Sequence, residues 1–127
     1  MSADVPVVKD PNGQAPVPTA WRAALAGVAN AIGQGDYQAL ASMAMIRPVS
    51  VPVAEAIAVN IRDYGVNLTD LPAESWLTSV SQWMGGYWDV LVDLFSIEEG
   101  ASDLTLVVRV YEVGTEYSFE IQSVHVP

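Results

Sequence analysis

Apolar and polar side chains alternate with a period of two along the C-terminal part of the chain. The pattern covers residues 87–96 and 103–113, and in both runs the even-numbered positions carry apolar side chains. Such alternation is typical of β-strands that bury one face. We therefore expect two strands whose buried faces consist of Trp88, Val90, Val92 and Leu94 in the first and Leu104, Leu106, Val108 and Val110 in the second.

A third run, over residues 116–126, completes the predicted sheet. Its apolar positions alternate and then change parity at Val124, which predicts a β-bulge near Gln122–Ser123. Gly114–Thr115, just before this run, fits a two-residue hairpin turn. The three runs together predict a three-stranded antiparallel meander.

The N-terminal half repeats its apolar residues at helical spacing instead. Caps and breakers place four helices over residues 19–33, 36–44, 52–64 and about 72–84. The apolar face of the first helix consists of Trp21, Leu25, Val28 and Ile32. That of the fourth consists of Trp76, Leu77, Val80, Trp83 and Met84, and Gly85–Gly86 closes the helix.

Residues 1–18 differ from the rest because four prolines interrupt them. Proline fixes φ and removes a donor, so this segment is predicted to be an extended Pro-rich arm. Its valines either dock on a sheet edge or belong to a frayed terminal tail. Residues 19–127 are expected to form a single α+β domain, with N-terminal helices packed on one face of a C-terminal three-stranded antiparallel β-meander.

Acidic residues are concentrated in the second half of the chain. The formal net charge is -10, and residues 65–127 contribute about −9 of it, because ten Asp and Glu face Arg109 alone there. A negative electrostatic field attracts cationic partners. It argues against binding to nucleic acid or to an anionic membrane, since both require clustered Lys and Arg. We therefore expect a basic protein partner, and the oligomeric state stays open.

Features that the sequence lacks indicate the cellular compartment of the protein. There is no cysteine, so disulfides and thiol chemistry are ruled out, which fits a reducing cytoplasm. No apolar run approaches the roughly 18 residues of a membrane-spanning helix. The N-terminus also lacks the basic start and apolar stretch of a signal peptide. The sequence thus favours a cytoplasmic protein.

The hairpin between the first two strands carries the densest carboxylates. A loop over residues 97–102 is expected to present Glu98 and Glu99, with Asp93 and Asp103 beside its base. Several oxygens suit a hard cation such as Ca²⁺ or Mg²⁺. The spacing is not that of an EF-hand, however, and a solvated turn explains the same residues, so no metal site is predicted.

His125 is the single histidine of the chain. The turn at Gly114–Thr115 places it opposite Leu104, near Glu99 and Asp103. We expect a structural histidine bonded to a carboxylate or to the backbone, and the alternatives are a general base or a metal ligand. No P-loop, dinucleotide fingerprint, H-E-x-x-H or G-x-S-x-G motif is present. No catalytic residue and no cofactor are therefore predicted, and enzymatic activity is disfavoured.

The predicted strand pairing also places charged residues side by side. Asp89 lies opposite Arg109, and Glu120 flanks Arg109 on the other side, which predicts a cross-strand ion network rather than an anion site.

Tryptophans are dense around Gly85–Gly86, and they either seal the junction of helix and sheet or form an exposed platform for a partner: Trp76, Trp83 and Trp88.

Residues Trp88 to Leu106 carry the pattern W-x-V-L-V-D-L-x-x-x-E-E-G-x-S-D-L-T-L, and Ile121, His125 and Val126 carry a closing I-x-x-x-H-V. The chain thereby resembles a small family of uncharacterised bacterial proteins, a domain of unknown function. The family brings no established activity, so this resemblance supports the sheet and not a mechanism. A weaker likeness, through residues 35–40 after a first helix, is to the NTF2-like α+β cone.

These features favour a non-enzymatic acidic binding protein, of an immunity or inhibitor type, that meets a basic partner such as a bacterial toxin domain. The binding residues are expected to be Asp93, Glu98, Glu99, Asp103 and His125. The alternative is a small NTF2-like enzyme or ligand-binding protein with a pocket between helices and sheet. A pocket that closes on His125 would favour the alternative, whereas a filled core with exposed carboxylates would favour the inhibitor.

Overall fold

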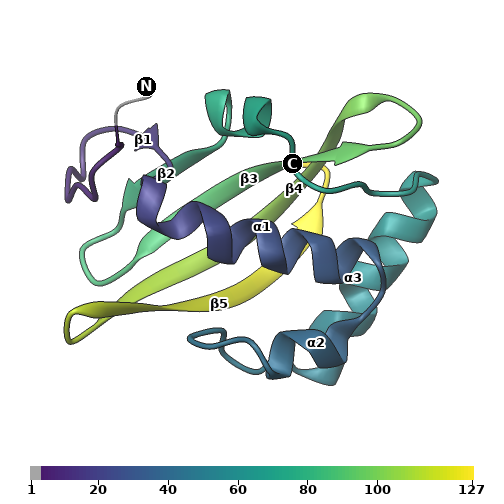
Figure 1. Cartoon of the computed structure of the whole chain (residues 1–127), viewed down its shortest axis with the longest axis horizontal. Helices are drawn as coiled ribbons and strands as arrows, with labels where there is room; N and C mark the ends of the chain where they lie inside the picture. Colours follow the sequence, from purple (N-terminus) through teal and green to yellow (C-terminus); the bar gives the residue numbers. More distant parts are fainter. Residues whose placement is uncertain (1–3) are drawn as a thin grey trace.

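The computed structural model of the chain describes residues 4–127 and shows a five-stranded antiparallel sheet with α1 across one face (Figure 1). The strands follow one another in chain order and are β1 (Ala15–Pro16), β2 (Val80–Trp83), β3 (Trp88–Ser96), β4 (Gly100–Val113) and β5 (Glu116–His125). The helices are α1 (Thr19–Gly33), α2 (Tyr37–Ala41), α3 (Val51–Tyr64) and the 3₁₀-helix η1 (Ala73–Leu77).

The prediction of a three-stranded meander is wrong, because two further strands extend the sheet. β2 occupies Val80–Trp83, where the sequence predicts part of a fourth helix. Over so short a run the apolar residues fit both a helix and a strand. Pairing with the long strand β3, which puts Val80 opposite Leu91, decides between the two. Leu77, expected on the buried side of that helix, is 85% exposed.

The N-terminal arm supplies the other additional strand and docks on the sheet. Its last residues pair with β2 as β1, and the indole Nε1 of Trp88 donates a 2.8 Å hydrogen bond to the carbonyl of Val8. Of the arm predicted over residues 1–18, residues 1–3 lie outside the described part. Pro16 has no N–H to offer to a further strand, so β1 is a natural end of the sheet.

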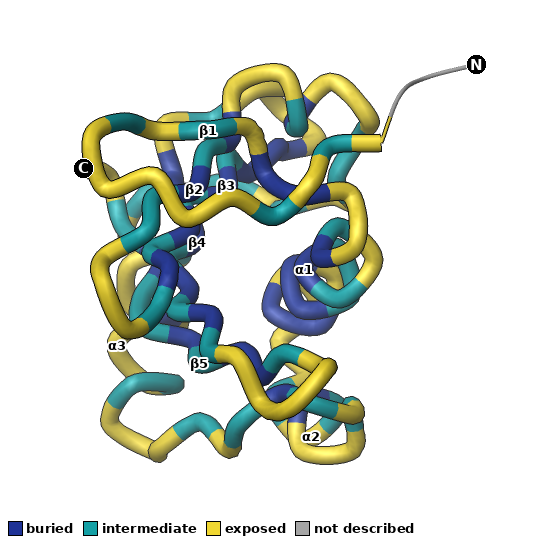
Figure 2. Tube along the Cα trace, turned by 90° about the vertical axis from the view of Figure 1, so that its left-hand side faces the viewer, coloured by how far each residue is buried: buried dark blue, intermediate teal, exposed yellow. Residues whose placement is uncertain are grey.

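The predicted faces of β3 and β4 are confirmed. Their even-numbered apolar residues are buried, whereas the alternate residues Asp89, Asp93 and Arg109 are only partly buried. The buried side packs against α1, whose predicted apolar face is buried as well: Trp21, Leu25, Val28 and Ile32. Figure 2 shows buried residues gathered where α1 faces the strands. We call this covered side of the sheet the inner face and the opposite side the outer face.

The predicted bulge and hairpin turn in the last strand are also confirmed. Val107 lies opposite Ser123 and Val108 opposite Ile121, which leaves Gln122 as the extra residue of β5. The bulge restores Val124 to the inner face, where it is fully buried.

Gly114, the first residue of the turn, has φ 63°, in the left-handed region where a Cβ causes strain.

The free edge of β3 beyond β2 is closed by side chains and a loop. The N–H of Asp93 donates to the hydroxyl of Ser79 (2.9 Å), and its carbonyl accepts from the hydroxyl of Ser75 (2.7 Å). Both serines are buried. Farther along, residues 67–69 pair with residues 95–97 through two backbone hydrogen bonds of 2.9 Å. The backbone of β3 is therefore satisfied past the end of β2.

The free edge of β5 is covered in a similar way. The N–H of Phe119 donates to Met45, and its carbonyl accepts from the N–H of Arg47, both at 2.8 Å. The carbonyl of Val124 accepts a 2.9 Å bond from the side-chain amide of Asn60 on α3. α3 packs alongside β5 (Figure 1). These contacts occupy part of the β5 edge, where another strand could otherwise pair.

Three of the four predicted helices are confirmed, with changes at their ends. Asp36 caps α2 by accepting the N–H of Ala39, but this helix ends at Ala41 rather than near Ala44. α3 ends at Gly65, whose φ is 86°. Within residues 4–127, no helix is both long and apolar enough to cross a membrane.

Candidate functional site

The outer face of the sheet presents its residues in rows that cross the strands. Strand pairing places three apolar residues side by side: Val80, Leu91 and Val107. A polar row on one side consists of Asp93, Thr105 and His125. The row on the other side consists of Gln82, Asp89, Arg109 and Glu120. An apolar centre with polar margins is the usual arrangement of a surface that binds another protein.

A groove follows β3 and β4 along this face. It consists of three adjoining hollows with volumes of ≈ 200, 280 and 500 Å³. The first two share the apolar row, and the second and third share Asp93 and Thr105. The rim is formed by Gln14, Leu77, Thr78 and Pro127. We call this feature the outer groove.

The carboxylates at the wide end of the outer groove have no ion-pair partner among residues 4–127. Asp93, Asp103 and Glu74 line this end. Ion pairs among residues 4–127 join the chain's cations to other carboxylates: Lys9 to Glu112, Arg47 to Glu120, Arg62 to Asp63 and Arg109 to Asp89. The remaining cation, Arg22, donates to a backbone carbonyl and lies over Trp76. The groove therefore combines apolar surface with unpaired negative charge.

The turn between β3 and β4 is tighter than the predicted loop over residues 97–102. Ser96 pairs with Gly100, so three residues form the turn. The register shifts just before it, because the hydroxyl of Ser102 donates to the carbonyl of Leu94 and replaces a regular ladder bond. Asp103 lies on the same face of β4 as Thr105 and lines the groove, and its N–H donates to the hydroxyl of Tyr64 at the end of α3.

Two predicted site residues, Glu98 and Glu99, fasten this turn to the rest of the fold. Glu98 accepts hydrogen bonds from the backbone N–H (2.9 Å) and the side-chain amide (2.7 Å) of Asn67, and these bonds lower the pKa of Glu98. Glu99 accepts a 2.5 Å bond from the hydroxyl of Tyr64, which raises the pKa of Tyr64. Of the five predicted binding residues, the structure therefore brings Asp93, Asp103 and His125 to the groove and engages the other two elsewhere.

His125 does not lie where the sequence predicts. The bulge at Gln122 shifts the register by one, so His125 pairs with Thr105 rather than with Leu104. Its Nδ1 is 2.8 Å from the hydroxyl of Ser123, on the same outer face, and this serine is its partner in place of a carboxylate or the backbone. His125 lines the middle of the outer groove as a polar, partly buried side chain.

The predicted ion network around Arg109 is confirmed on one side. Arg109 Nε lies 3.4 Å from Asp89 Oδ1, and its guanidinium stacks 4.5 Å from the ring centroid of Tyr87. Glu120 is bound by Arg47 instead, at 3.4 Å. This end of the outer face is thus internally paired, in contrast to the carboxylates of the groove.

The tryptophans serve mainly the core. Trp88 is 1% exposed and packs edge-on against Trp21, with 5.1 Å between ring centroids. Trp83 lies 4.5 Å from Trp88 and is partly exposed beneath Lys9, whose Nζ is 5.1 Å from the Trp83 ring. Trp76 is separate and packs under Arg22. The sealing role predicted for the tryptophans holds for Trp88, although the junction joins two strands and not a helix and a strand.

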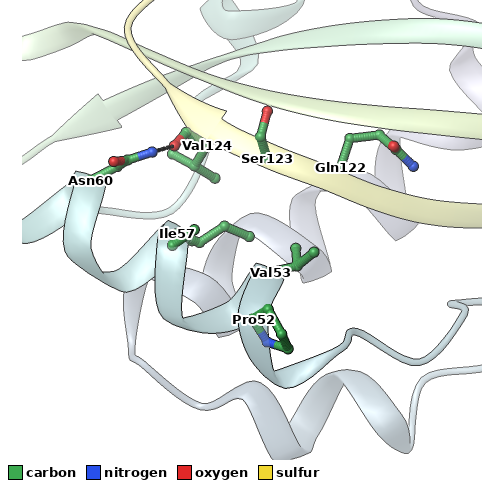
Figure 3. A pocket seen from close by; sticks show the side chains of 8 residues that line it. Pro52, Val53, Ile57, Asn60, Gln122, Ser123 and Val124 are labelled. Atoms are coloured by element: carbon green, nitrogen blue, oxygen red, sulfur yellow. Dashed lines mark hydrogen bonds between the residues drawn. The ribbon is translucent and has the colours of Figure 1, made fainter.

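A second hollow lies between α3 and β5 and is shown in Figure 3. It has a volume of ≈ 200 Å³, with apolar walls and a polar rim at Asn60, Gln122 and Ser123. None of its lining residues is titratable, and His125 is not among them. Ligand pockets are usually larger, roughly 300–1,000 Å³, and contain convergent polar groups.

Several residues of the site have no signal in the sequence. Leu77 and Glu74 reach the groove because η1 replaces the expected helix. Ser75 and Ser79 hold the backbone of Asp93 from a distance of fourteen or more positions along the chain. Within residues 4–127, no group of three or more His, Cys, Asp or Glu side chains is arranged to hold a metal ion. The groove offers carboxylates, a histidine and apolar side chains for contact with a partner.

Comparison with known proteins supports the expected membership of an uncharacterised domain family. Neither a curated protein nor a solved structure matches the chain. A family model matches residues 29–127, which include α2, α3 and strands β2 to β5. The chain therefore belongs to the family described as the domain of unknown function DUF7668.

Proposed function

We propose that this chain is a non-enzymatic binding protein whose outer groove receives a basic protein partner. The observation that carries the proposal is the set of carboxylates without a cation along an uncovered, partly apolar groove: Asp93, Asp103 and Glu74. Such a groove supplies both the steering field and the desolvated contact that a cationic protein surface requires.

The partner is expected to be a basic protein in the cytoplasm, and an immunity or inhibitor role towards a toxin-like bacterial protein fits this chemistry. A formal charge of -10 speeds encounter with a cationic surface and repels other acidic proteins. The alternative is a small enzyme or ligand-binding protein with a pocket between helices and sheet. One hollow between α3 and β5 is small and has no titratable lining residue. A second, of ≈ 410 Å³, is lined by Asp63, Tyr64 and His125 but lies wide open to solvent, so it gives the alternative less support than the outer groove gives the binding protein.

The test is affinity capture from the source cell followed by measurement of association rates. The site variant is Asp93→Asn with Asp103→Asn, which removes two groove charges without touching the hydrogen bonds that anchor the turn. The matched control is Glu55→Gln with Glu116→Gln, which removes two exposed charges on α3 and β5. Glu98 and Glu99 are left unchanged because their replacement would disturb the turn as well as the charge.

We expect affinity capture to recover a basic protein that binds to the wild type and to the control but not to the site variant. Its association rate should fall by about an order of magnitude in the site variant, and the wild-type rate should fall steeply with salt. Equal association rates for the site variant and the control would show that the groove charges only aid solubility, and the proposal would fail.

A further inference from the structure

We infer that the partner places an amphipathic α-helix along the outer groove, with aliphatic side chains on the apolar row and Lys or Arg towards Asp93 and Asp103. This inference rests on the proposed function and specifies the element that binds. It follows from the position of the groove on a face of the sheet, the length of the groove and the distribution of charge along it.

The outer groove lies on a face of the sheet and not at an edge, so a partner in it cannot add a strand. Part of each edge is also occupied, that of β3 by Ser75, Ser79 and residues 67–69, and that of β5 by Met45, Arg47 and Asn60. A segment bound on the face of a sheet finds no backbone groups to pair with. A helix satisfies its own N–H and C=O groups, so it is the element that can lie there without leaving them unpaired.

The groove has the dimensions of a short helix. Its β3 side runs from Asp89 to Phe95, which corresponds to about 20 Å of strand. A helix of about 13 residues spans the same length. The inner face already carries α1, so a helix on the outer face would complete three layers, a common arrangement around a sheet.

The apolar contact has a specific anchor at the rim. Leu77 is 85% exposed and stands beside the groove, on the side of η1. Leu77 lines the wide hollow, and Leu91 and Val107 line the adjoining ones, so the groove offers aliphatic side chains along its length. An aliphatic stripe at spacings of i, i+4 and i+7 on a partner helix would bury these side chains.

The charge distribution selects the partner and excludes a second copy of this chain. The carboxylates lie at the wide end of the groove, and two copies meeting here would bring two charges of -10 together. A helix with Lys or Arg beside its apolar stripe meets the same carboxylates with the opposite sign.

The experiment uses the full chain and a designed peptide of about 14 residues, with Leu at i, i+4, i+7 and i+11 and Lys on the adjoining positions. A scrambled peptide of the same composition is the control for charge. Binding is measured by fluorescence anisotropy, and the site is located from NMR shifts of the Leu91 and Val107 methyl groups. Leu77→Ser is compared with Val51→Ser, whose side chain is 68% exposed at the start of α3.

We expect the amphipathic peptide to bind more tightly than the scrambled one and to shift the two methyl groups. Its affinity should fall about tenfold with Leu77→Ser and stay unchanged with Val51→Ser. Both variants replace exposed side chains and so should fold. Equal binding of both peptides, equal effects of both variants, or shifts confined to α1 and α3 would overturn the helix inference. The proposed function would survive such a result if the captured partner still depended on Asp93 and Asp103.

Discussion

At the scale of single residues, the few cations of this chain decide which carboxylates remain available. Arg109 is committed to Asp89 and to the ring of Tyr87, and Arg47 is committed to Glu120 and lies 3.9 Å from the ring centroid of Tyr111. These pairs neutralise one end of the outer face and leave the other end negative. Burial of side chains does not create this contrast, since Asp89 and Asp93 are both partly buried.

Replacement of Arg109 by Ala is expected to lower the free energy of unfolding modestly. Both partners of the ion pair are roughly one-third exposed, so solvent screens the pair and part of the loss comes from stacking on Tyr87. Urea unfolding at low and high salt measures the effect, which should shrink in high salt. Arg109→Lys keeps the charge without the planar stack and should lie between wild type and Ala. A salt-independent loss would assign the whole effect to packing.

Glu98 makes the stability of the turn depend on pH. Hydrogen bonds from the backbone and then the side chain of Asn67 lower the pKa of Glu98 in the folded chain. The carboxylate thus stabilises the fold above the ordinary pKa of Glu, and this contribution is lost as pH falls through the lowered value. Glu98→Gln should therefore be less stable than wild type at neutral pH, and the two should converge in acid. Glu55→Gln is the control, and the same pH dependence in both variants would contradict the prediction.

At the scale of elements, side chains and loops continue the hydrogen bonding of the sheet where a neighbouring strand ends. β2 covers only the first part of β3, and two buried serines and residues 67–69 continue the hydrogen bonding along it. This arrangement keeps the edge from pairing with other chains, a hazard of exposed strands. It also fixes the backbone at Asp93, in the middle of the outer groove.

Ser75→Ala is expected to cost about 1–3 kcal/mol of stability, because the fully buried Ser75 is the donor to the carbonyl of Asp93 and its loss leaves that carbonyl without it. Ser42→Ala is the control, since its hydroxyl bond to Ala39 is exposed. Thermal or urea unfolding gives the loss, and hydrogen exchange should speed up at the N–H of Asp93, which is held by the neighbouring Ser79. Equal stability of both variants would mean that water replaces the serine hydroxyl.

The predictability of these elements depends on their length and on where their partners lie. β3 and β4 alternate over many residues, and the bulge at Gln122 shows as a change of parity, so the sequence alone predicts them. β2 is too short for its period to be read, and its strand state comes from pairing with β3. In the site, parity places Asp93 on the outer face, but the bonds from Asn67 and Tyr64 to the turn involve distant residues without a pattern.

At the scale of the whole molecule, negative charge works against compactness. The chain carries fifteen Asp and Glu against five Lys and Arg, and only four carboxylates within residues 4–127 take part in ion pairs. The filled core between α1 and the sheet holds the fold together in spite of this repulsion. The same excess of negative charge opposes association between copies of the chain.

Added salt is therefore expected to stabilise the folded chain. Raising NaCl from about 0.1 M to about 1 M shortens the Debye length from about 10 Å to about 3 Å and screens the repulsion. The urea midpoint of the wild type should rise, whereas it should rise less in the Glu55→Gln, Glu116→Gln variant, which carries two fewer charges. A midpoint that falls with salt would mean that the four ion pairs outweigh the repulsion.

The position of Pro127 at the rim of the outer groove has a practical consequence for handling the protein. A purification tag or fluorescent fusion placed after Pro127 starts beside the carboxylates and shields them from whatever approaches. The described part of the arm starts elsewhere, with Val5 bonded to Thr19 at the start of α1. Surface immobilisation and fusions for interaction screens should therefore be made through the N-terminus, because a C-terminal attachment would mask binding at the groove.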